Sequence, residues 1–226
     1  MNCFNKFLIV LTSGGGYFPM NAEENLINWK GQVIGITRLP VPWYAPKFLV
    51  AGKMKASIPE YSAIKGLQRK YYSIEADTGL FGGVYLWENE RSARDWWNEA
   101  FFMRINKTYG SNNKIPLKPV LYVHSLDKRA KVETGDNWTS IRRYSIPSES
   151  FGTMNKYFET KIQTFQKSKG SHSLWVAGVD NSKIEIITLW ANKDSMRSAN
   201  FSELILPSWK EEETIKTRVP VMIHNQ

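Results

Sequence analysis

Three histidines offer the side chain that titrates most readily near neutral pH, so acid–base chemistry is the first function to consider. His124 and His224 each follow a Pro-Val pair, whereas His172 lies in a Lys-Gly-Ser-His turn typical of a solvated loop. His124 is the candidate general base, because its half of the chain also carries an unusual pair of glycines. A structural role shared with His224 is the alternative. The sequence contains no Ser-His-Asp order, metal-ligand cluster, phosphate loop or dinucleotide fingerprint, and we predict no metal site.

The other candidate residues lie in the stretch GLFGGVYLWENERSARDWW, residues 79–97. Glycine weakens a strand and often marks a bulge or a place where a ligand approaches closely. Tryptophan buries a large apolar area and needs a partner for its ring N–H, which suits the wall of a pocket. Adjacent tryptophans at helical spacing also occur in ordinary cores, so packing is the competing interpretation. The candidate binding residues here are Gly82, Gly83, Tyr85, Trp87, Trp96 and Trp97.

Three short motifs occur twice in the same order, which indicates an internal duplication. They are Ser-Ile-Pro at 57–59 and 145–147, Leu-Trp-x-Asn-x-x-Ser-x-Arg at 86–94 and 189–197, and Pro-Val followed by His at 119–124 and 220–224. The second copy is a control for the candidate site. It has Glu185 and Ile186 in place of the two glycines, and Ala199 and Asn200 in place of the two tryptophans. The shared residues are therefore predicted to be scaffold, and a pocket is expected beside the residues found only in the first copy.

Each copy is predicted to fold as β-α-β-β-α-β, the ferredoxin-like arrangement. In the first copy the expected elements are a strand at Phe48–Met54, a helix opening at Pro59, strands at Tyr71–Ala76 and Val84–Trp87, a helix capped by Asn89, and a strand at Val120–His124. In the second copy they are a strand at Ser140–Ser145, a helix at about 149–166, strands at Leu174–Gly178 and Ile184–Trp190, a helix from Asp194, and a strand at Val219–His224. The expected divisions are a candidate signal peptide at 1–22, an extension at 23–45, the first repeat at 46–126, a linker at 127–137 and the second repeat at 138–226.

The predicted strands are apolar on both faces, because Val84 and Leu86 alternate with Tyr85 and Trp87. A sheet with one face in water would show polar residues at alternate positions. The fold class is therefore α+β, with two tandem ferredoxin-like repeats packed sheet to sheet as a barrel within one chain. Alternate residues of a strand point to opposite faces. If Tyr85 and Trp87 face the barrel interior, they line the space that the glycines open.

The segment GGVYLWENERSA, residues 82–93, resembles the Gly-Gly-Ile-Tyr-Leu-Phe strand, acidic turn and Ser-Ala helix start of the dimeric α+β barrel superfamily. This superfamily includes the antibiotic-biosynthesis-monooxygenase (ABM) type and the YdhR-like monooxygenase group. The resemblance covers residues 46–126 well and 138–224 more weakly. It implies a cofactor-independent monooxygenase-like enzyme that acts on an aromatic or polyketide-like small molecule. In that role Tyr85 and Trp87 would form the wall, His124 would be the base, and Arg69 or Arg38 would steady the substrate anion.

Two alternatives share this fold. One is a non-catalytic protein that binds a hydrophobic ligand in the same apolar space, and the other is a pair of domains with a filled barrel and a structural role. Haem-degrading relatives carry a similar Leu-Trp-Glu-x-x-x-Ser stretch, a helical Trp and then a His that binds the iron. Trp96 matches that Trp, but Asn106 holds the ligand position, and FLVAGKM lacks the Asn of the family's first strand. Both departures count against haem degradation.

The overall charge points to a basic but ordinary surface. The 30 Lys and Arg exceed the 21 Asp and Glu, for a net charge of +9 in 226 residues, yet they are scattered along the chain. Nucleic-acid-binding modules usually concentrate basic residues on one face or helix, so we expect no nucleic-acid partner. No apolar run approaches the roughly 18 residues of a membrane-spanning helix.

The N-terminal residues have the outline of a secretory signal, with Lys6, a short apolar run and Ala22 before two glutamates. The apolar run is short, however, and Met20 is a poor match to the usual small residue before a cleavage site. Export to the periplasm or the medium and retention in the cytoplasm both stay open. The single cysteine, Cys3, excludes a disulfide within the chain. Tandem copies should form the barrel within one chain, so we expect a monomer, with a homodimer as the alternative.

Overall fold

The computed structural model describes residues 31–41, 47–125 and 131–225. The candidate signal peptide, residues 1–22, lies outside these residues. The first repeat contains β1 (Val33–Leu39), α1 (Lys47–Ala56), α2 (Ile58–Ser62), β2 (Leu67–Glu75), β3 (Phe81–Trp87), α3 (Glu90–Trp96), α4 (Glu99–Tyr109) and β4 (Lys118–Ser125). The second contains β5 (Val132–Ser145), α5 (Met154–Lys167), β6 (Ser171–Asp180), β7 (Lys183–Trp190), α6 (Lys193–Ser198) and β8 (Lys210–His224), with short 3-10 helices at Ser148–Thr153 and Phe201–Glu203.

The predicted strand at Phe48–Met54 is wrong, because this segment forms part of α1. Val50 and Met54, four residues apart, are both buried against the sheet, whereas Lys53 is exposed. This spacing suits one face of a helix and not one face of a strand. The first strand is instead β1, Val33–Leu39, which lies inside the segment 23–45 that the sequence predicts to be an extension.

Other predicted boundaries also differ. The long helix expected after Asn89 is broken into α3 and α4, because Asn98 caps a new helix by accepting a hydrogen bond from the backbone N–H of Phe101 (3.0 Å). Strand β5 begins at Val132, inside the predicted linker 127–137. The remaining predicted strands overlap observed ones, but β2 begins at Leu67 and β8 at Lys210, well before the predicted starts at Tyr71 and Val219. Asn89 caps α3 as expected.

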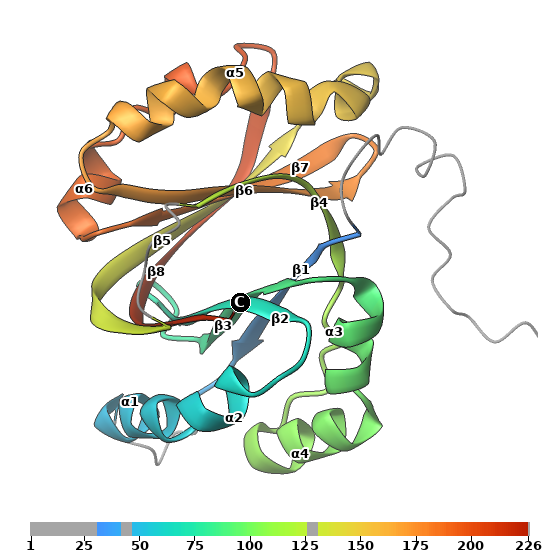
Figure 1. The fold of residues 1–226 in the computed structure, drawn as a ribbon, viewed down its shortest axis with the longest axis vertical. Coiled ribbons are helices and arrows are strands. Elements are labelled where there is room, and N and C mark those ends of the chain that lie inside the picture. The colour runs from blue at the N-terminus through green and yellow to red at the C-terminus, as the bar shows by residue number, and fades with distance from the viewer. Residues whose placement is uncertain (1–30, 42–46, 126–130, 226) are drawn as a thin grey trace, which may run out of the picture.

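The eight strands close into one antiparallel barrel in the order β1-β3-β2-β8-β5-β7-β6-β4. The last strand of each repeat is exchanged: β4 pairs with β6 of the second repeat, and β8 pairs with β2 of the first. Figure 1 shows the helices α1 to α4 outside one half of the barrel and α5 and α6 outside the other. The predicted fold class, an α+β barrel built from two ferredoxin-like repeats in one chain, is confirmed. No helix in the described parts of the chain has both the length and the apolar character needed to cross a bilayer.

The two repeats correspond in local geometry. Gly66 and Gly170 both adopt a positive φ, of 76° and 77°, just before β2 and β6. A Cβ atom at either position would collide with a serine side chain, Ser92 or Ser195, so both sites require glycine. Strands β2 and β6 each carry an irregularity after their first residue. These correspondences fix which positions of the two repeats are equivalent.

The helix caps of the two repeats are expected to contribute equally to stability. Asn89 and Asn192 each accept a hydrogen bond of 2.8 Å from the backbone N–H of the serine three residues later. Replacing either with alanine should therefore lower the free energy of unfolding by about 1 kcal/mol. Denaturant titration measures this, with alanine at Asn112, an exposed loop residue, as the control. Unchanged stability in both cap variants would contradict the equivalence.

The interior of the barrel is filled by apolar side chains from both repeats. Tyr71 of β2 stacks on Trp175 of β6, with ring centroids 4.5 Å apart, and its hydroxyl lies 2.9 Å from Ser173 Oγ. Val84 and Leu86 point into this core. Tyr85 and Trp87 therefore point outward, toward the helices of the first repeat. The condition under which these two residues would line the barrel interior is not met, because the aliphatic residues of β3 face the interior and its aromatic residues face the helical layer.

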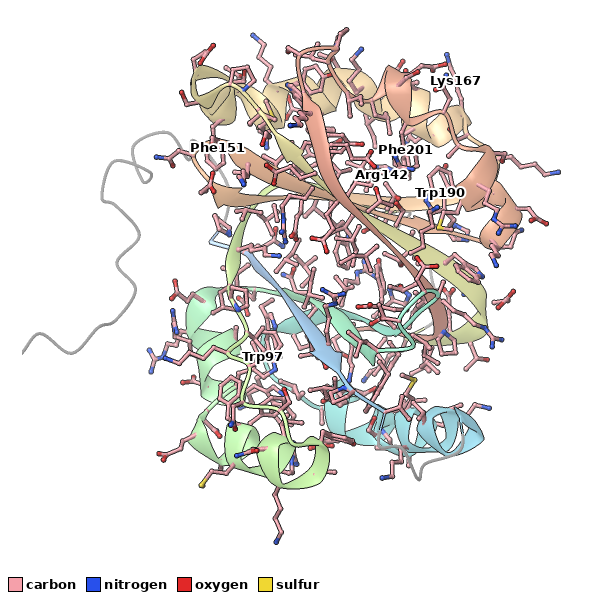
Figure 2. The ribbon with its side chains drawn as sticks, turned by 180° about the vertical axis from the view of Figure 1, so that it is seen from behind. Trp97, Arg142, Phe151, Lys167, Trp190 and Phe201 are labelled. Atoms are coloured by element: carbon pink, nitrogen blue, oxygen red, sulfur yellow. The ribbon has the colours of Figure 1, made fainter. Side chains whose placement is uncertain are left out.

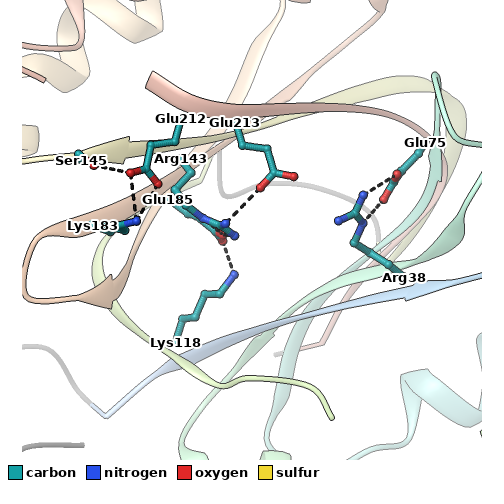
Figure 3. A network of polar contacts seen from close by, with 9 residues as sticks. All are labelled: Arg38, Glu75, Lys118, Arg143, Ser145, Lys183, Glu185, Glu212 and Glu213. Carbon is teal, nitrogen blue, oxygen red and sulfur yellow. Dashed lines mark hydrogen bonds and ion pairs between the residues drawn. The ribbon is translucent and has the colours of Figure 1, made fainter. Parts of the chain in front are cut away.

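A network of ion pairs joins the repeats at one end of the barrel (Figure 3). Glu185 of β7, only 2% exposed, lies 2.5 Å from Lys118 Nζ of β4 and 2.6 Å from Arg143 Nη2 of β5. Arg143 also reaches Glu213 of β8, at 3.2 Å. A buried carboxylate is tolerated only when it is paired in this way. The network therefore ties the exchanged strand β4 to three strands of the second repeat.

Candidate functional site

A cavity of about 270 Å³ lies outside the barrel, between the sheet of the first repeat and its helices. Strands β1, β2 and β3 form one wall, and helices α1, α2 and α4 form the other. The lining residues that matter below are Thr37, Ser57, Tyr61, Lys70, Tyr72, Tyr85 and Thr108. Much of the remaining lining is apolar, and includes Val50, Met54, Phe81, Phe101 and Ile105. The cavity is slightly smaller than typical ligand pockets of about 300–1,000 Å³, which suits a small and largely apolar molecule.

Lys70 brings a buried amine into this cavity. Its side chain is only 2% exposed, because Lys70 shares the outward face of β2 with Tyr72 and lies beneath the helices. The neighbours of Nζ are aromatic rings, with centroids at 2.8 Å for Tyr61, 3.8 Å for Tyr72 and 5.0 Å for Tyr85. Within the described parts of the chain, no carboxylate forms an ion pair with Nζ. A buried lysine without an anionic partner is unusual.

Opposing effects act on the protonation of Lys70. Burial lowers the pKa of Lys70 well below its ordinary value, and the negative charge of Glu60 raises it by less. The tyrosine rings also favour the ammonium form, by about 2 kcal/mol for a desolvated cation–π contact. Loss of hydration costs an unpaired ion several kcal/mol, so desolvation prevails. The amine is therefore held toward its neutral form, in which its lone pair can accept a proton or attack an electrophile.

The hydroxyl groups around the amine form hydrogen bonds with other partners. Tyr72 Oη lies 2.7 Å from Ser57 Oγ, and Tyr85 forms hydrogen bonds with Thr37 and Tyr61. Burial raises the pKa of Tyr61, Tyr72 and Tyr85, so all three hydroxyls stay protonated. The cavity thus combines one basic amine with three phenol groups that keep their protons. This pairing suits a ligand that carries an acidic proton beside an oxygen atom.

The second repeat has no amine at the equivalent position. Lys70 pairs with Tyr85, two residues before Trp87, and in the second repeat Leu174 pairs with Thr188, two residues before Trp190. Leu174 is buried in a cluster that contains Phe158 and Trp209. Figure 2 shows Trp190 and Phe201 between the second sheet and its helices, where they belong to this cluster. Apolar side chains therefore pack this layer of the second repeat, and the amine belongs to the first repeat alone.

Of the residues predicted to bind a ligand, Tyr85 and Gly82 line the cavity. Trp97 lies instead between α3 and the sheet (Figure 2), with its ring 5.1 Å from that of Tyr85 and directly over Gly35. Trp96 packs on Tyr61 at 5.6 Å. Trp87 is completely buried beside Trp97, at 5.2 Å. These three tryptophans thus belong to the core of the first repeat, which is the competing interpretation given above.

The two glycines have different neighbours. A Cβ atom at Gly82 would collide with the backbone carbonyl of Thr37 on β1, and one at Gly83 would lie 3.1 Å from the ring of Tyr85. Gly82 therefore allows β1 to approach β3 closely, and Gly83 leaves room for the ring of Tyr85. The close approach predicted from these glycines is made by the protein itself.

The structure does not bring His124, Arg69 or Arg38 to the cavity. His124 lies on β4, paired with Leu174 of β6, and its Nε2 is 3.2 Å from Nε2 of Gln166 on α5. Arg69 contacts Nδ1 of His224. Arg38 is 40% exposed and forms an ion pair with Glu75. All three occupy other parts of the barrel, because β4 is exchanged into the second sheet and Arg69 and Arg38 alternate with the residues that face the helices.

The sequence signal for Lys70 is its register in the duplication. Counting four residues on from the equivalent glycines, Gly66 and Gly170, places Lys70 at the position of a buried leucine, Leu174. The predicted strand begins at Tyr71, one residue too late to include Lys70. Tyr61 carries no comparable signal, since it lies on a short helix beside Pro59. Among residues 31–41, 47–125 and 131–225 no group of three or more His, Cys, Asp or Glu side chains is placed to hold a metal ion.

Comparisons with known proteins identify the fold. No family model and no curated protein sequence matches the chain. A candidate monooxygenase from Fusobacterium nucleatum superimposes with a TM-score of 0.60 at 10% identity, over 87% of this chain and 96% of that one. A candidate monooxygenase from Lactobacillus acidophilus gives 0.54 at 9% identity, over 86% and 96%. An anthrone oxidase-like protein gives 0.50 at 11% identity, over 85% and 92%. The chain therefore has the dimeric α+β barrel fold of these monooxygenase-like proteins, with both halves of the barrel built from one polypeptide.

Proposed function

We propose that the protein is a monooxygenase-like enzyme that oxidises a small aromatic ketone or phenol in the cavity of the first repeat. One observation carries the proposal: a buried amine, without a carboxylate partner among the described residues, faces an apolar cavity lined by tyrosines. The shared fold with an anthrone oxidase-like protein supports an aromatic ketone as the substrate class. The base is then Lys70 and not His124, since His124 lies outside the cavity.

In the proposed reaction the substrate itself supplies the electrons. The neutral amine of Lys70 removes a proton from a methylene carbon conjugated to the aromatic carbonyl. Tyrosine hydroxyls of the cavity donate hydrogen bonds to the carbonyl oxygen, which carries the resulting negative charge. The carbanion passes electrons to molecular oxygen, one at a time, and a carbon–oxygen bond forms. The resulting peroxide anion takes up the proton from Lys70 to give a hydroperoxide, which loses water, so that CH₂ and O₂ become C=O and H₂O.

An oxygen-uptake assay with a hydroxylated aromatic ketone tests this proposal. The purified protein should consume one molecule of oxygen for each molecule of substrate, and the product should be the corresponding diketone. Saturable binding of the same ketone with no oxygen uptake would contradict an enzymatic role and favour a ligand-binding protein. If the protein neither binds the ketone nor consumes oxygen, the cavity is not the site for this class of molecule.

A cavity-blocking variant tests the location of the site. Thr108 is an exposed residue at the end of α4 that lines the cavity, so Thr108→Trp should obstruct the ligand and weaken binding about tenfold or more. The matched control is Thr160→Trp, at an exposed position on α5 of the second repeat. Calorimetric titration of both variants with the ketone measures the difference. Equal affinities would place the binding site elsewhere.

A further inference from the structure

We infer that Lys70 also captures carbonyl compounds covalently: its amine condenses with a small aryl aldehyde held in the cavity of the first repeat and forms an imine. This activity goes beyond the proposed oxidation, because it needs no oxygen. It rests on the position of the amine, on the shape of the cavity and on the absence of a carboxylate partner for Nζ among the described residues.

The surroundings of Nζ favour nucleophilic attack. A lysine that forms an ion pair has its ammonium form stabilised and cannot attack a carbonyl, whereas a desolvated lysine in an apolar pocket is a typical imine-forming residue. Nζ lies among three tyrosine rings, and the hydroxyls of Tyr72 and Tyr85 are hydrogen-bonded to Ser57 and to Thr37 and Tyr61. The amine therefore keeps its lone pair for a ligand. Burial lowers its pKa, in agreement with this geometry.

The charged groups facing the cavity lie on its helical wall. Glu60 of α2 forms an ion pair with Arg104 of α4 at 3.6 Å, and both side chains are more than 40% exposed. Lys53 of α1 is also exposed. These groups line the same cavity as Nζ, but none forms an ion pair with it. Of the two lysines that line the cavity, Lys70 is thus the buried one, and Lys53 is an internal comparison.

The condensation balances without a further reactant. The lone pair of Nζ attacks the carbonyl carbon, and a proton moves from nitrogen to the former carbonyl oxygen to give a carbinolamine. A tyrosine hydroxyl of the cavity lends a proton to the leaving hydroxyl group and recovers one from nitrogen. The C–O bond breaks, water leaves, and the C=N bond forms, so that aldehyde and amine become imine and water. Hydrolysis reverses each step, and the capture is therefore reversible.

The walls of the cavity select the class of carbonyl compound. Flat aromatic side chains and a volume of about 270 Å³ suit a single aromatic ring, which can stack on the tyrosines. An aldehyde carbon is less hindered than a ketone carbon, which matters for an amine that lies against a ring. We therefore assign an aryl aldehyde, with benzaldehyde as the simplest probe.

Reductive trapping tests the inference. The full-length protein is incubated with benzaldehyde and cyanoborohydride, digested, and analysed by mass spectrometry. At about pH 6.5 ordinary exposed lysines are almost fully protonated. Under these conditions the peptide containing Lys70 should gain one benzyl group at least about tenfold faster than peptides containing Lys53 or the exposed Lys65. Labelling of Lys70 no faster than these two lysines would overturn the inference.

Two variants test whether the labelling depends on Lys70 itself and on access to the cavity. Lys70→Leu should lose the adduct at this position, with the labelling of Lys65 unchanged. Thr108→Trp, which obstructs the cavity, should slow the labelling of Lys70 but leave that of Lys65 as it is, and an unchanged rate at Lys70 would also count against the inference. The outcome is distinguishable from that of the oxygen-uptake assay, since adducts can form in a protein that consumes no oxygen, and oxygen uptake can occur without adducts.

Discussion

Lys70→Leu is expected to abolish oxygen uptake and, at the same time, to make the protein more stable. The proposed base is lost, which should lower the rate at least about a hundredfold. Leucine occupies the equivalent position 174, so the side chain suits a buried site of this geometry. Removing a buried, unpaired amine should raise the free energy of unfolding at neutral pH, by about the 0.5–2 kcal/mol that single stabilising substitutions contribute. The midpoint temperature of thermal unfolding should rise by about 2–4 °C for each kcal/mol of added stability in a chain of this length.

The pH dependence of stability identifies the cause of this gain. Burial lowers the pKa of Lys70 in the folded protein, whereas the unfolded chain has the ordinary value of 10.5. Between these two values the unfolded state binds more protons, so Lys70 makes the wild-type protein more stable as the pH rises. The advantage of Lys70→Leu should therefore be complete below the folded pKa and should disappear as the pH approaches 10.5. A constant advantage at all pH values would point to better packing alone, and a less stable variant would contradict burial of an uncharged amine.

Glu185→Ala is expected to be the most destabilising single change in the inter-repeat network. Glu185 is the shared partner of Lys118 and Arg143 (Figure 3), and it is almost completely buried. Without it, the ammonium group of Lys118 stays buried and unpaired, which costs about 3–5 kcal/mol. Arg143 loses less, because it is one-third exposed and keeps its contact with Glu213. Chemical denaturation of the variant measures the loss.

A double replacement distinguishes the effect of the buried charges from the effect of side-chain packing. Lys118→Met together with Glu185→Leu removes both buried charges and keeps apolar volume, so it should recover most of the stability lost in Glu185→Ala. Arg218→Ala is the control, because Arg218 of β8 forms an ion pair with Asp136 in which both side chains are more than half exposed. It should cost about 1 kcal/mol or less. A large loss in Arg218→Ala, or no loss in Glu185→Ala, would contradict the role given to burial.

The duplication made most of the fold predictable from the sequence. Leu-Trp strands and Asn caps repeat because they obey local rules, and the structure places both sets in equivalent positions. The sequence prediction omits the first strand, because it assigns a strand to the apolar segment with Val50 and Met54, although those residues have helical spacing. Strand β1 has a weaker pattern, with Gly35 in its centre under the ring of Trp97.

The candidate site was harder to predict, because the face of a strand that points into the barrel depends on how the two sheets pack. Alternation along β3 separates Tyr85 from Val84 and Leu86, but it does not say which side is the barrel and which is the helical layer. Sequence order predicts that His124 lies in the first copy, whereas exchange of β4 puts it beside α5 of the second. Only the register of the strands, Lys70 opposite Tyr85, brings the buried amine to the tyrosines.

Because the final strands are exchanged, residues from both repeats support the cavity. Val221 and Ile223 of β8, which close the second repeat, pack against Val50 and Met54 of α1 and against Tyr72. The second repeat, which has a leucine where the first has Lys70, thus supplies part of the support on which the first repeat's site rests. The first repeat carries the site and the second supplies part of its packing, so that a truncation or redesign of either repeat affects both.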